Sequence, residues 1–235
     1  MLGKIADKLT GRDTEILSME ALRDERPDKL PIDREQPDED LETATFAIGC
    51  FWGPDARFGA IPGVVRTRVG YAGGEKTDPT YHDLGNHAET VQIDFDPGKI
   101  SYKELLEIFW SSHDCTAPSS MQYRSIIFFD NKDQKEKAKK SLENQEQESS
   151  RIKTDIKRLD TFNLAENYHQ KYHLKQRSDF REFFRDIYSA GQITNSTAAA
   201  RINGIIAGFG TEELEDEIGS YGLTEELERK VRRGL

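Results

Sequence analysis

Gly49-Cys50-Phe51-Trp52-Gly53 joins an apolar run at residues 44–48 to the start of a predicted helix near Pro54. A cysteine at this junction faces unpaired backbone N–H groups and the positive end of the helix dipole. That environment favours the thiolate, so Cys50 is predicted to be a nucleophile at neutral pH. Phe51 and Trp52, which follow it, can wall an apolar pocket. The alternative is a small buried cysteine at the end of a strand.

The elements around this stretch indicate the fold class. Strands and helices alternate without the regular rhythm of a doubly wound parallel sheet, which predicts an α+β two-layer sandwich with a mixed sheet. A helix over residues 54–60 follows the cysteine. Strands are expected at residues 44–50, 64–69, 89–95, 122–129 and 152–156, and further helices at residues 102–112 and 132–149.

Composition divides the 235 residues into three parts. Residues 1–40 are rich in charged residues and proline, and are expected to form short helices and an extended arm outside the core. Residues 41–175 form the predicted core domain. Residues 176–235 are a predicted helical extension, too small to be stable unless it docks on the rest. Its helices are expected at residues 179–188 and 198–207 and after Thr224.

Charge and cysteine content exclude several classes of partner. The formal net charge of -10 argues against nucleic acid or an anionic membrane as the main partner. No signal segment and no run long enough to span a bilayer is present, so a reducing, cytoplasmic location is expected. Two cysteines are too few for a disulfide scaffold. His169 and His173 have metal-ligand spacing but lack the glutamate of a zincin motif, so no metal site is predicted.

Glu89 is the predicted partner of Cys50. It has the parity of Val91 and Ile93 in the alternating run at residues 89–95, so its side chain should point with the apolar ones. Burial there raises a carboxyl pKa, and a protonated glutamic acid can donate a proton at pH 7. The alternative is a glutamate at the solvent edge of the sheet.

Five further residues can contribute to a site around Cys50. Tyr81 and Tyr123 are phenols that can hold a polar oxygen without bringing charge, although both can equally serve in packing. His113 and Asp114 stand at a helix end, where a structural role competes with support of the site. Cys115 follows them in a predicted accessible loop. It is either a thiol that resolves an oxidised intermediate or a bystander.

These motifs together resemble the peptide methionine sulfoxide reductase A family, which reduces the S epimer of methionine sulfoxide. The resemblance covers about residues 43–175 and follows the family's motif order. It is carried by Gly49-Cys50-Phe51-Trp52-Gly53, Gly70-Tyr71-Ala72-Gly73-Gly74, Pro79-Thr80-Tyr81, Gly85-Asn86-His87-Ala88-Glu89, Asp96-Pro97, Phe109-Trp110-Ser111-Ser112-His113-Asp114, Gln122-Tyr123-Arg124-Ser125 and Ala165-Glu166-Asn167-Tyr168-His169-Gln170-Lys171-Tyr172.

The resemblance implies a core related to the ferredoxin-like plait and a thiol mechanism without a bound cofactor. Cys50 would attack the sulfoxide sulfur, and Phe51 and Trp52 would form the pocket for the S-methyl group. Cys50 would then be left as a sulfenic acid, which thioredoxin or another thiol reduces. The implied substrates are oxidised proteins and peptides that contain methionine S-sulfoxide.

The same resemblance assigns the groups around the sulfoxide oxygen. Glu89 would donate the proton that makes this oxygen a better leaving group, and Tyr81 and Tyr123 would hydrogen-bond to it. A methyl pocket on one side and hydrogen-bond donors on the other would distinguish the two sulfoxide epimers.

The chain departs from the family's pattern in two places, which make it a short-loop variant. Many members have a longer loop before Gln-Tyr-Arg, with an aspartate that shapes the active site. Here residues 115–121 carry no carboxylate, and that role is not transferred to Asp114. Many members also have resolving cysteines near the C-terminus, whereas Cys115 is the last cysteine here. We therefore hypothesise that Cys115 resolves the Cys50 sulfenic acid as a disulfide.

Two other functions compete with a working repair enzyme. A catalytically impaired member of the family would bind methionine-containing peptides or act as a regulatory module. A different thiol enzyme, such as a peroxidase, would use the same cysteine. Turnover of a peptide methionine S-sulfoxide that is lost in Cys50→Ser separates the first possibility from the enzyme. Consumption of peroxide without any sulfoxide identifies the second.

Overall fold

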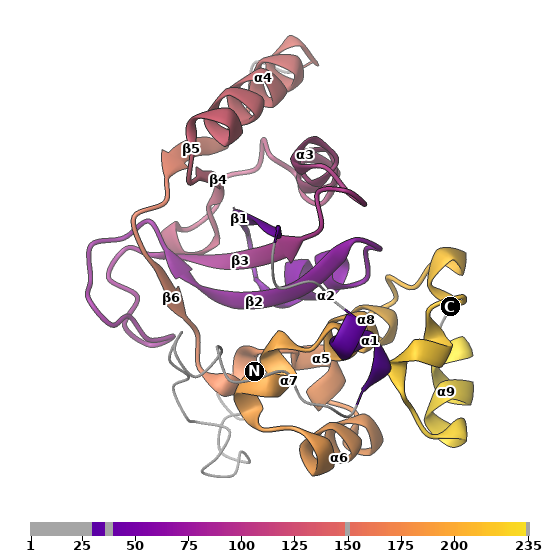
Figure 1. The fold of residues 1–235 in the computed structure, drawn as a ribbon. Coiled ribbons are helices and arrows are strands. Elements are labelled where there is room, and N and C mark those ends of the chain that lie inside the picture. The colour runs from indigo at the N-terminus through magenta and orange to yellow at the C-terminus, as the bar shows by residue number, and fades with distance from the viewer. Residues whose placement is uncertain (1–29, 36–39, 149–150, 234–235) are drawn as a thin grey trace.

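The computed structural model describes residues 30–35, 40–148 and 151–233, and its centre is a mixed six-stranded sheet (Figure 1). The strand order is β5-β4-β1-β3-β2-β6. Neighbouring strands are antiparallel except β4 and β5, which are parallel. The strands are β1 (Glu42–Ile48), β2 (Val64–Ala72), β3 (Ala88–Phe95), β4 (Ser125–Phe129), β5 (Asp155–Arg158) and β6 (Phe162–Leu164). The predicted α+β class with a mixed sheet is confirmed.

Three helices pack around the strands that form the core. They are α2 (Trp52–Gly59), α3 (Tyr102–Ser111) and α4 (Lys132–Glu148). Because side chains alternate along a strand, one face of β1 and β3 is apolar and packs against Phe58 of α2 and Leu105, Leu106 and Phe109 of α3. Ser101 caps α3 through a capping box with Glu104.

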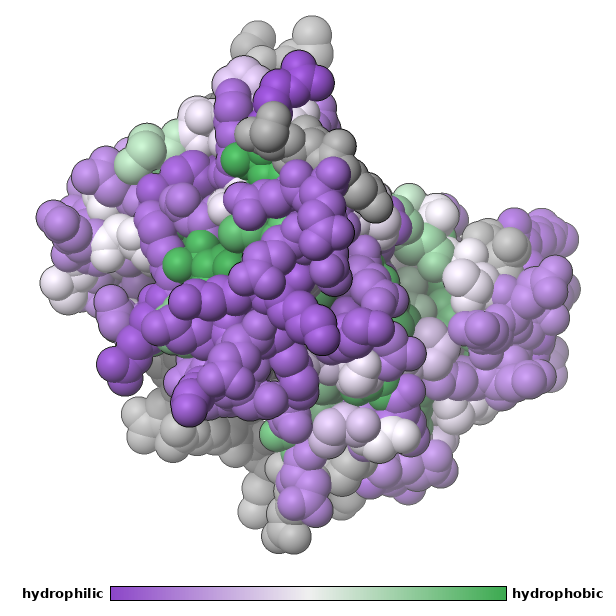
Figure 2. Space-filling view, turned by 90° about the horizontal axis from the view of Figure 1, so that it is seen from above, coloured by the Kyte–Doolittle hydropathy of each residue, from purple (hydrophilic) through white to green (hydrophobic). Residues whose placement is uncertain are grey.

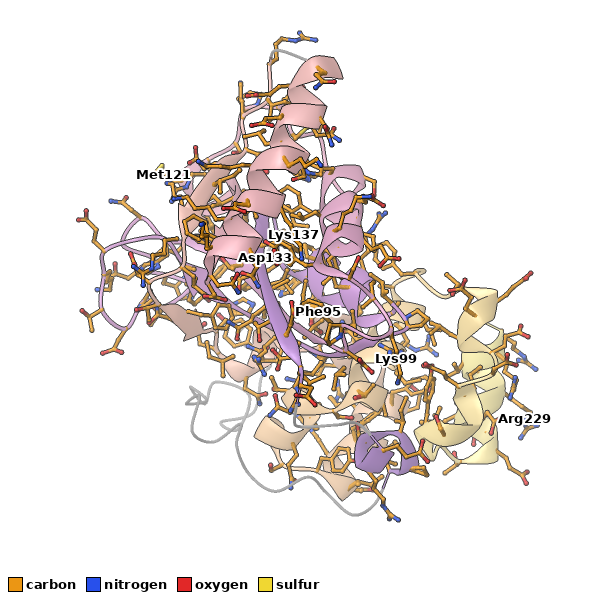
Figure 3. The ribbon with its side chains drawn as sticks, turned by 45° about the horizontal axis from the view of Figure 1, so that its top comes forward. Phe95, Lys99, Met121, Asp133, Lys137 and Arg229 are labelled. Carbon is orange, nitrogen blue, oxygen red and sulfur yellow. The ribbon has the colours of Figure 1, made fainter. Side chains whose placement is uncertain are left out.

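Helix α4 extends away from the sheet at the top of Figure 1. Among residues 132–147 of this helix, Gln134 and Ala138 are the buried ones. Exposed ion pairs, such as Lys137 with Asp133 at 2.7 Å, lie on its surface (Figure 3). The face of the molecule viewed from this side is mainly hydrophilic, with a hydrophobic patch near its centre (Figure 2). The helix predicted over residues 132–149 is confirmed as α4.

The C-terminal part forms a second core that packs on α2. Its helices are α5 (Tyr172–Lys175), α6 (Ser178–Ile187), α7 (Ala190–Asn195), α8 (Thr197–Ile206) and α9 (Glu225–Arg232). Helices α2 and α8 approach very closely: a Cβ on Gly59 would lie 2.7 Å from the Ala200 carbonyl oxygen, and one on Gly204 would lie 2.5 Å from that of Ala56. The extension therefore docks on α2 through close backbone contact. The sequence predicted docking because a segment of this size is not stable on its own. Thr224 caps α9, as predicted.

The N-terminal segment corrects one expectation. Residues 30–35, which include α1 (Pro31–Glu35), are not outside the core, because Leu30 and Ile32 are buried in the C-terminal cluster. The Asp33 carboxylate accepts hydrogen bonds from the Thr197 backbone N–H at 2.6 Å and the Ser196 hydroxyl at 2.8 Å, at the start of α8. The arm predicted for residues 1–29 lies outside the described residues.

Short irregular elements account for the other differences. The strand predicted from residue 122 begins at Ser125, because the preceding residues form a 3₁₀ turn. The sequence did not predict β6, a strand of only three residues. Within the described residues, no helix has both the length and the apolar character needed to cross a membrane. The 3₁₀ turns are Met121–Tyr123, Asn167–His169, Glu212–Leu214 and Ile218–Tyr221.

Candidate active site

The chain turns sharply between β1 and α2, and this turn presents Cys50. Strand β1 ends at Ile48, and Gly49 adopts a φ of 82°, a left-handed conformation that glycine accepts without steric cost. Helix α2 then begins at Trp52, earlier than predicted, with Phe51 as its N-cap. The Cys50 side chain is exposed and its thiol is free. The predicted position of the cysteine between a strand and a helix N-terminus is confirmed.

Glu89 lies beside Cys50 and is almost completely buried, with an exposed fraction of 1%. Its Oε2 accepts a 3.0 Å hydrogen bond from the backbone N–H of Phe51, and its Oε1 accepts a 2.7 Å bond from Nε2 of Gln122. The Cys50 thiol lies close enough to the Glu89 carboxyl group for each to influence the pKa of the other. The inward orientation predicted from strand parity is therefore correct.

The two groups influence each other's protonation. Burial raises the pKa of Glu89, opposed by hydrogen bonds from Phe51, Gln122 and Cys50. Desolvation by the surrounding atoms also raises the pKa of Cys50, and the charge of Glu89 adds to that effect, while the Trp52 backbone N–H lowers it. The thiolate predicted from the helix N-terminus alone is therefore not favoured in the substrate-free site. A neutral Glu89 removes one cause of the raised Cys50 pKa.

Both predicted tyrosines belong to this cluster. The phenol of Tyr123 lies close to that of Tyr81. Desolvation raises the pKa of Tyr123, followed by the charges of Glu89, Tyr81 and Cys50. A phenol with a raised pKa stays neutral and keeps its proton for donation. The structure thus brings Cys50, Glu89, Tyr81 and Tyr123 into one site.

An aromatic wall flanks the cysteine. Trp52 stacks on Tyr172 with ring centroids 3.6 Å apart and planes 4° from parallel. Its indole Nε1 donates a 3.1 Å hydrogen bond to Nδ1 of His169, whose ring also lies 4.9 Å from that of Phe51. The sequence predicted Phe51 and Trp52 as pocket residues but assigned no part of the pocket to His169 or Tyr172. In the sequence, the one indication of this aromatic wall is that His169 and Tyr172 both belong to the motif at residues 165–172.

His169 is neutral in this wall. Burial lowers its pKa to about 3, with smaller contributions from the charges of Lys175 and His82. Because Nδ1 accepts the Trp52 bond, the proton is assigned to Nε2, which is buried without a hydrogen-bond partner among the described residues. Nε2 lies 3.9 Å from Oε2 of Glu166.

Glu166 and Gln122 are site residues that sequence reasoning missed. The Glu166 carboxylate accepts hydrogen bonds from the Tyr71 hydroxyl at 2.7 Å and the Tyr81 backbone N–H at 3.0 Å, so it fixes the loop that carries Tyr81. Gln122 is the side-chain donor to Glu89. Both stand in motifs quoted for the family resemblance, which was the one signal available.

The remaining predicted residues have partners outside the group of Cys50, Glu89, Tyr81 and Tyr123. Nε2 of His113 hydrogen-bonds to the Ser125 hydroxyl at 2.7 Å, and Asp114 accepts from the Thr116 backbone and hydroxyl at 2.9 and 2.7 Å. Cys115 is half-buried against the core next to α3, and its pKa is raised by desolvation and then by the charge of Asp114. Among the described residues, no group of three or more His, Cys, Asp or Glu side chains is arranged to hold a metal ion.

This geometry places the chain in a class of enzyme. An exposed thiol beside a buried carboxyl group can attack an electrophile while the acid protonates the leaving group. The neutral phenols next to it suit an uncharged polar oxygen, and the aromatic wall suits an apolar group. These are the features of a thiol-dependent oxidoreductase.

Comparison with known proteins narrows this class to one family. The family model of peptide methionine sulfoxide reductases matches residues 42–199. The peptide methionine sulfoxide reductase of Drosophila melanogaster is 43% identical over 187 residues, which are 77% of this chain and 75% of that protein. MsrA of Methanococcoides burtonii is 46% identical over 57% of this chain and 97% of its own length. The chain belongs to the peptide methionine sulfoxide reductase family.

A solved structure agrees with this assignment. Methionine sulfoxide reductase A of Corynebacterium diphtheriae has a TM-score of 0.57 and 29% identity, and the match covers 71% of this chain and 90% of that one. The protein is therefore an α+β enzyme that reduces peptide methionine sulfoxide to methionine.

Proposed function

We propose that Cys50 and Glu89 carry out this reduction and that the substrate is the S epimer in oxidised proteins and peptides. The observation that carries the proposal is the position of the buried Glu89 carboxyl group beside the exposed Cys50, where it accepts a 3.0 Å hydrogen bond from the backbone N–H of Phe51, the next residue. Sulfoxide oxygen is a poor leaving group unless it is protonated, so a nucleophile beside an acid is the pair that the reaction requires.

The proposed step conserves atoms and electrons. Sγ of Cys50 attacks the sulfoxide sulfur while Glu89 gives a proton to the sulfoxide oxygen. The attack forms an S–S bond and leaves a hydroxyl group on the substrate sulfur. This hydroxyl then moves to Sγ: the substrate S–O bond and the new S–S bond break, an S–O bond forms on Cys50, and methionine leaves with Cys50 as a sulfenic acid. The thiol supplies the two electrons, and its proton passes to the neighbouring Glu89, which restores the acid. Repair of oxidised proteins is the corresponding role.

The surrounding residues would fix the orientation of the sulfoxide. Phe51 and Trp52 are proposed to receive the S-methyl group, since both rings belong to the aromatic wall. Tyr81 and Tyr123, whose phenols lie close together, would donate hydrogen bonds to the oxygen. With the methyl group and the oxygen held on opposite sides, only one epimer presents its sulfur to Cys50.

An external thiol, thioredoxin being the family's usual one, is proposed to return Cys50 to the thiol without a bound cofactor. The alternative is Cys115, whose backbone carbonyl accepts a 2.8 Å hydrogen bond from Lys153, just before β5. In the sheet, β5 is two strands away from β1, the strand that leads to Cys50. Resolution by Cys115 requires the two Cα atoms to come within about 7 Å of each other. The exposed Cys50 is directly accessible to an external thiol.

Two finer proposals concern the fold and the location. The order β1-α2-β2-β3-α3-β4, with neighbours β4-β1-β3-β2 all antiparallel, supports a ferredoxin-like plait as the core. A cytoplasmic location is proposed because a catalytic thiol needs the reducing conditions that the cytosol maintains.

Turnover of a peptide that contains methionine S-sulfoxide, with dithiothreitol or thioredoxin as reductant, tests the function. We expect methionine formation by the wild-type enzyme, loss of turnover in Cys50→Ser, and little turnover of the R epimer. Cys115→Ser is the matched thiol control and should stay active with dithiothreitol. Binding of the peptide without turnover would instead identify a binding module.

A further inference from the structure

We propose that Asn203, in the C-terminal helix α8, is a positioning residue for the aromatic wall of the active site. Its side chain is completely buried. Nδ2 donates a 3.2 Å hydrogen bond to Oδ2 of Asp55, and Oδ1 accepts a 3.0 Å bond from the backbone N–H of Leu174. The proposal rests on the function proposed above, in which this wall holds the substrate methyl group.

The two partners of Asn203 belong to the two helices that form the wall. Asp55 is in the first turn of α2, which begins at Trp52, and Leu174 is in α5, which begins at Tyr172. The rings of Trp52 and Tyr172 stack at 3.6 Å. One amide side chain therefore bridges the beginnings of the two helices whose first residues stack on each other.

Lys171 explains why this bridge affects the wall. It adopts a left-handed conformation, with φ 51° and ψ 50°, which is unfavourable for a residue with a side chain. This turn lies between His169 and Tyr172, and both of these residues contact Trp52. The conformation persists because the surrounding structure holds Lys171 at both its backbone and its side chain.

Asp55 provides much of that restraint. Its Oδ2 accepts the Lys171 backbone N–H at 3.1 Å, and its Oδ1 accepts Nζ of Lys171 at 2.8 Å; Nζ also donates to the Thr67 carbonyl at 2.6 Å. Asn203 donates to the same Oδ2. Without the Asn203 amide, Oδ2 of Asp55 would lose one of its hydrogen bonds. The Asp55 carboxylate would then hold Lys171 in its turn less firmly.

Several contacts hold helix α8 against α2, so Asn203 has a fixed position from which it can orient Asp55. Arg201, two residues earlier, donates to the carbonyls of Gly59 at 2.6 Å and Val64 at 2.8 Å. The close backbone approach at Gly59 and Gly204 adds to this. Asn203 also lies beyond residue 199, where the match to the family model ends. The C-terminal extension would thus contribute to substrate binding without contacting the substrate.

The test compares Asn203→Leu, which has a similar volume but no amide, with Ser196→Ala. Ser196 is the N-cap of the same helix and bonds to Asp33, so its loss weakens α8 without touching Asp55. Methionine formation is measured in a single turnover without reductant, over a range of peptide S-sulfoxide concentrations. We expect the half-saturating concentration to rise about tenfold in Asn203→Leu, with a limiting rate within about threefold of the wild type. Ser196→Ala should match the wild type in both.

Quenching of tryptophan fluorescence measures the accessibility of Trp52 in the aromatic wall, independently of activity. In a Trp110→Phe background, the remaining indole is Trp52, and we expect Asn203→Leu to increase its quenching by acrylamide. If the half-saturating concentration and the quenching both stay at wild-type values, or shift equally in Ser196→Ala, the proposal is overturned. Absence of sulfoxide reduction by the wild type would overturn the proposed function, while the quenching comparison would still decide whether Asn203 positions Trp52.

A second variant covers the case in which Asn203→Leu does not fold. Asn203→Ser leaves a hydroxyl too short to reach both Asp55 and Leu174. We expect the same rise in half-saturating concentration at smaller amplitude, with more quenching of Trp52. Wild-type values for both measurements in a folded Asn203→Ser protein would also overturn the proposal.

Discussion

Nε2 of Gln122 donates a 2.7 Å hydrogen bond to Oε1 of the buried Glu89. Gln122 follows Met121, which is 51% exposed at the surface (Figure 3). The Gln122 side chain therefore connects a solvent-facing loop to Glu89, the proposed catalytic acid. The same loop continues directly into Tyr123. The short loop therefore places a neutral donor on the acid, although its residues 115–121 carry no carboxylate.

The Gln122 bond should tune the pH dependence of the reaction. A donor to a carboxylate favours its ionised form, so its removal in Gln122→Leu should raise the pKa of Glu89 further. Protonated Glu89 would then persist to higher pH. We expect the alkaline limb of the single-turnover rate profile to move up by roughly one pH unit. In Glu89→Gln the rate should fall at least about a hundredfold. The alkaline limb should also disappear in this variant, which would assign the limb to Glu89. A limb that stays in place or moves to lower pH in Gln122→Leu contradicts this role.

Thiol labelling after one turnover identifies the recycling route. The position of Cys115 beside Lys153, two strands from β1, leads us to expect that it stays reactive after Cys50 is oxidised without reductant. Mass spectrometry of the alkylated protein should show one modified thiol, at Cys115, with Cys50 as the sulfenic acid. Simultaneous loss of both thiols, with a mass that corresponds to a disulfide, would instead establish Cys115 as the resolving cysteine.

Local patterns in the sequence predicted the parts of the site that depend on local geometry. Strand parity predicted that Glu89 points inward, because side chains alternate whatever the strand packs against. The order of apolar run, glycine and helix start placed Cys50 at the turn before α2. Capping chemistry predicted the beginning of α9 at Thr224, since the cap involves residues only three apart.

The rest of the site depends on contacts between distant parts of the chain. Trp52 and His169, which are hydrogen-bonded, are 117 residues apart in the sequence. Asp33 and its hydrogen-bond donor Thr197, at the start of α8, are 164 residues apart. No periodicity in the sequence encodes such distances. The raised pKa of Cys50 was also missed, because it results from desolvation and Glu89 in three dimensions, which here outweigh the local effect of the helix N-terminus.

Burial of neutral His169 should make the protein sensitive to acid. Its pKa in the folded protein is about 3, below the ordinary value of 6.5, so the unfolded state binds the extra proton between these pH values. The free energy of unfolding should therefore fall as the pH decreases below 6.5, by up to about 1.4 kcal/mol per pH unit from this residue. Urea unfolding at pH 7 and pH 5 should show a smaller pH-dependent loss in His169→Gln. Equal losses in the variant and the wild type would show that His169 is not the cause.

The fully buried ion pair between Lys171 and Asp55 should show strong coupling in a double-mutant cycle. Both side chains have no exposed surface, and Nζ lies 2.8 Å from Oδ1. Lys171→Met alone leaves an uncompensated buried carboxylate and should lower the free energy of unfolding by about 3 to 5 kcal/mol.

In the double variant Asp55→Leu/Lys171→Met neither charge remains, so its loss should be smaller than the sum of the single losses by at least about 1 kcal/mol. The exposed pair Lys103 and Glu107, 3.2 Å apart on α3, is the matched control and should show little coupling because water screens it. Denaturant unfolding of both cycles measures the difference. Equal coupling in the two pairs would mean that the buried pair does not restrain the turn at Lys171 on which the aromatic wall depends.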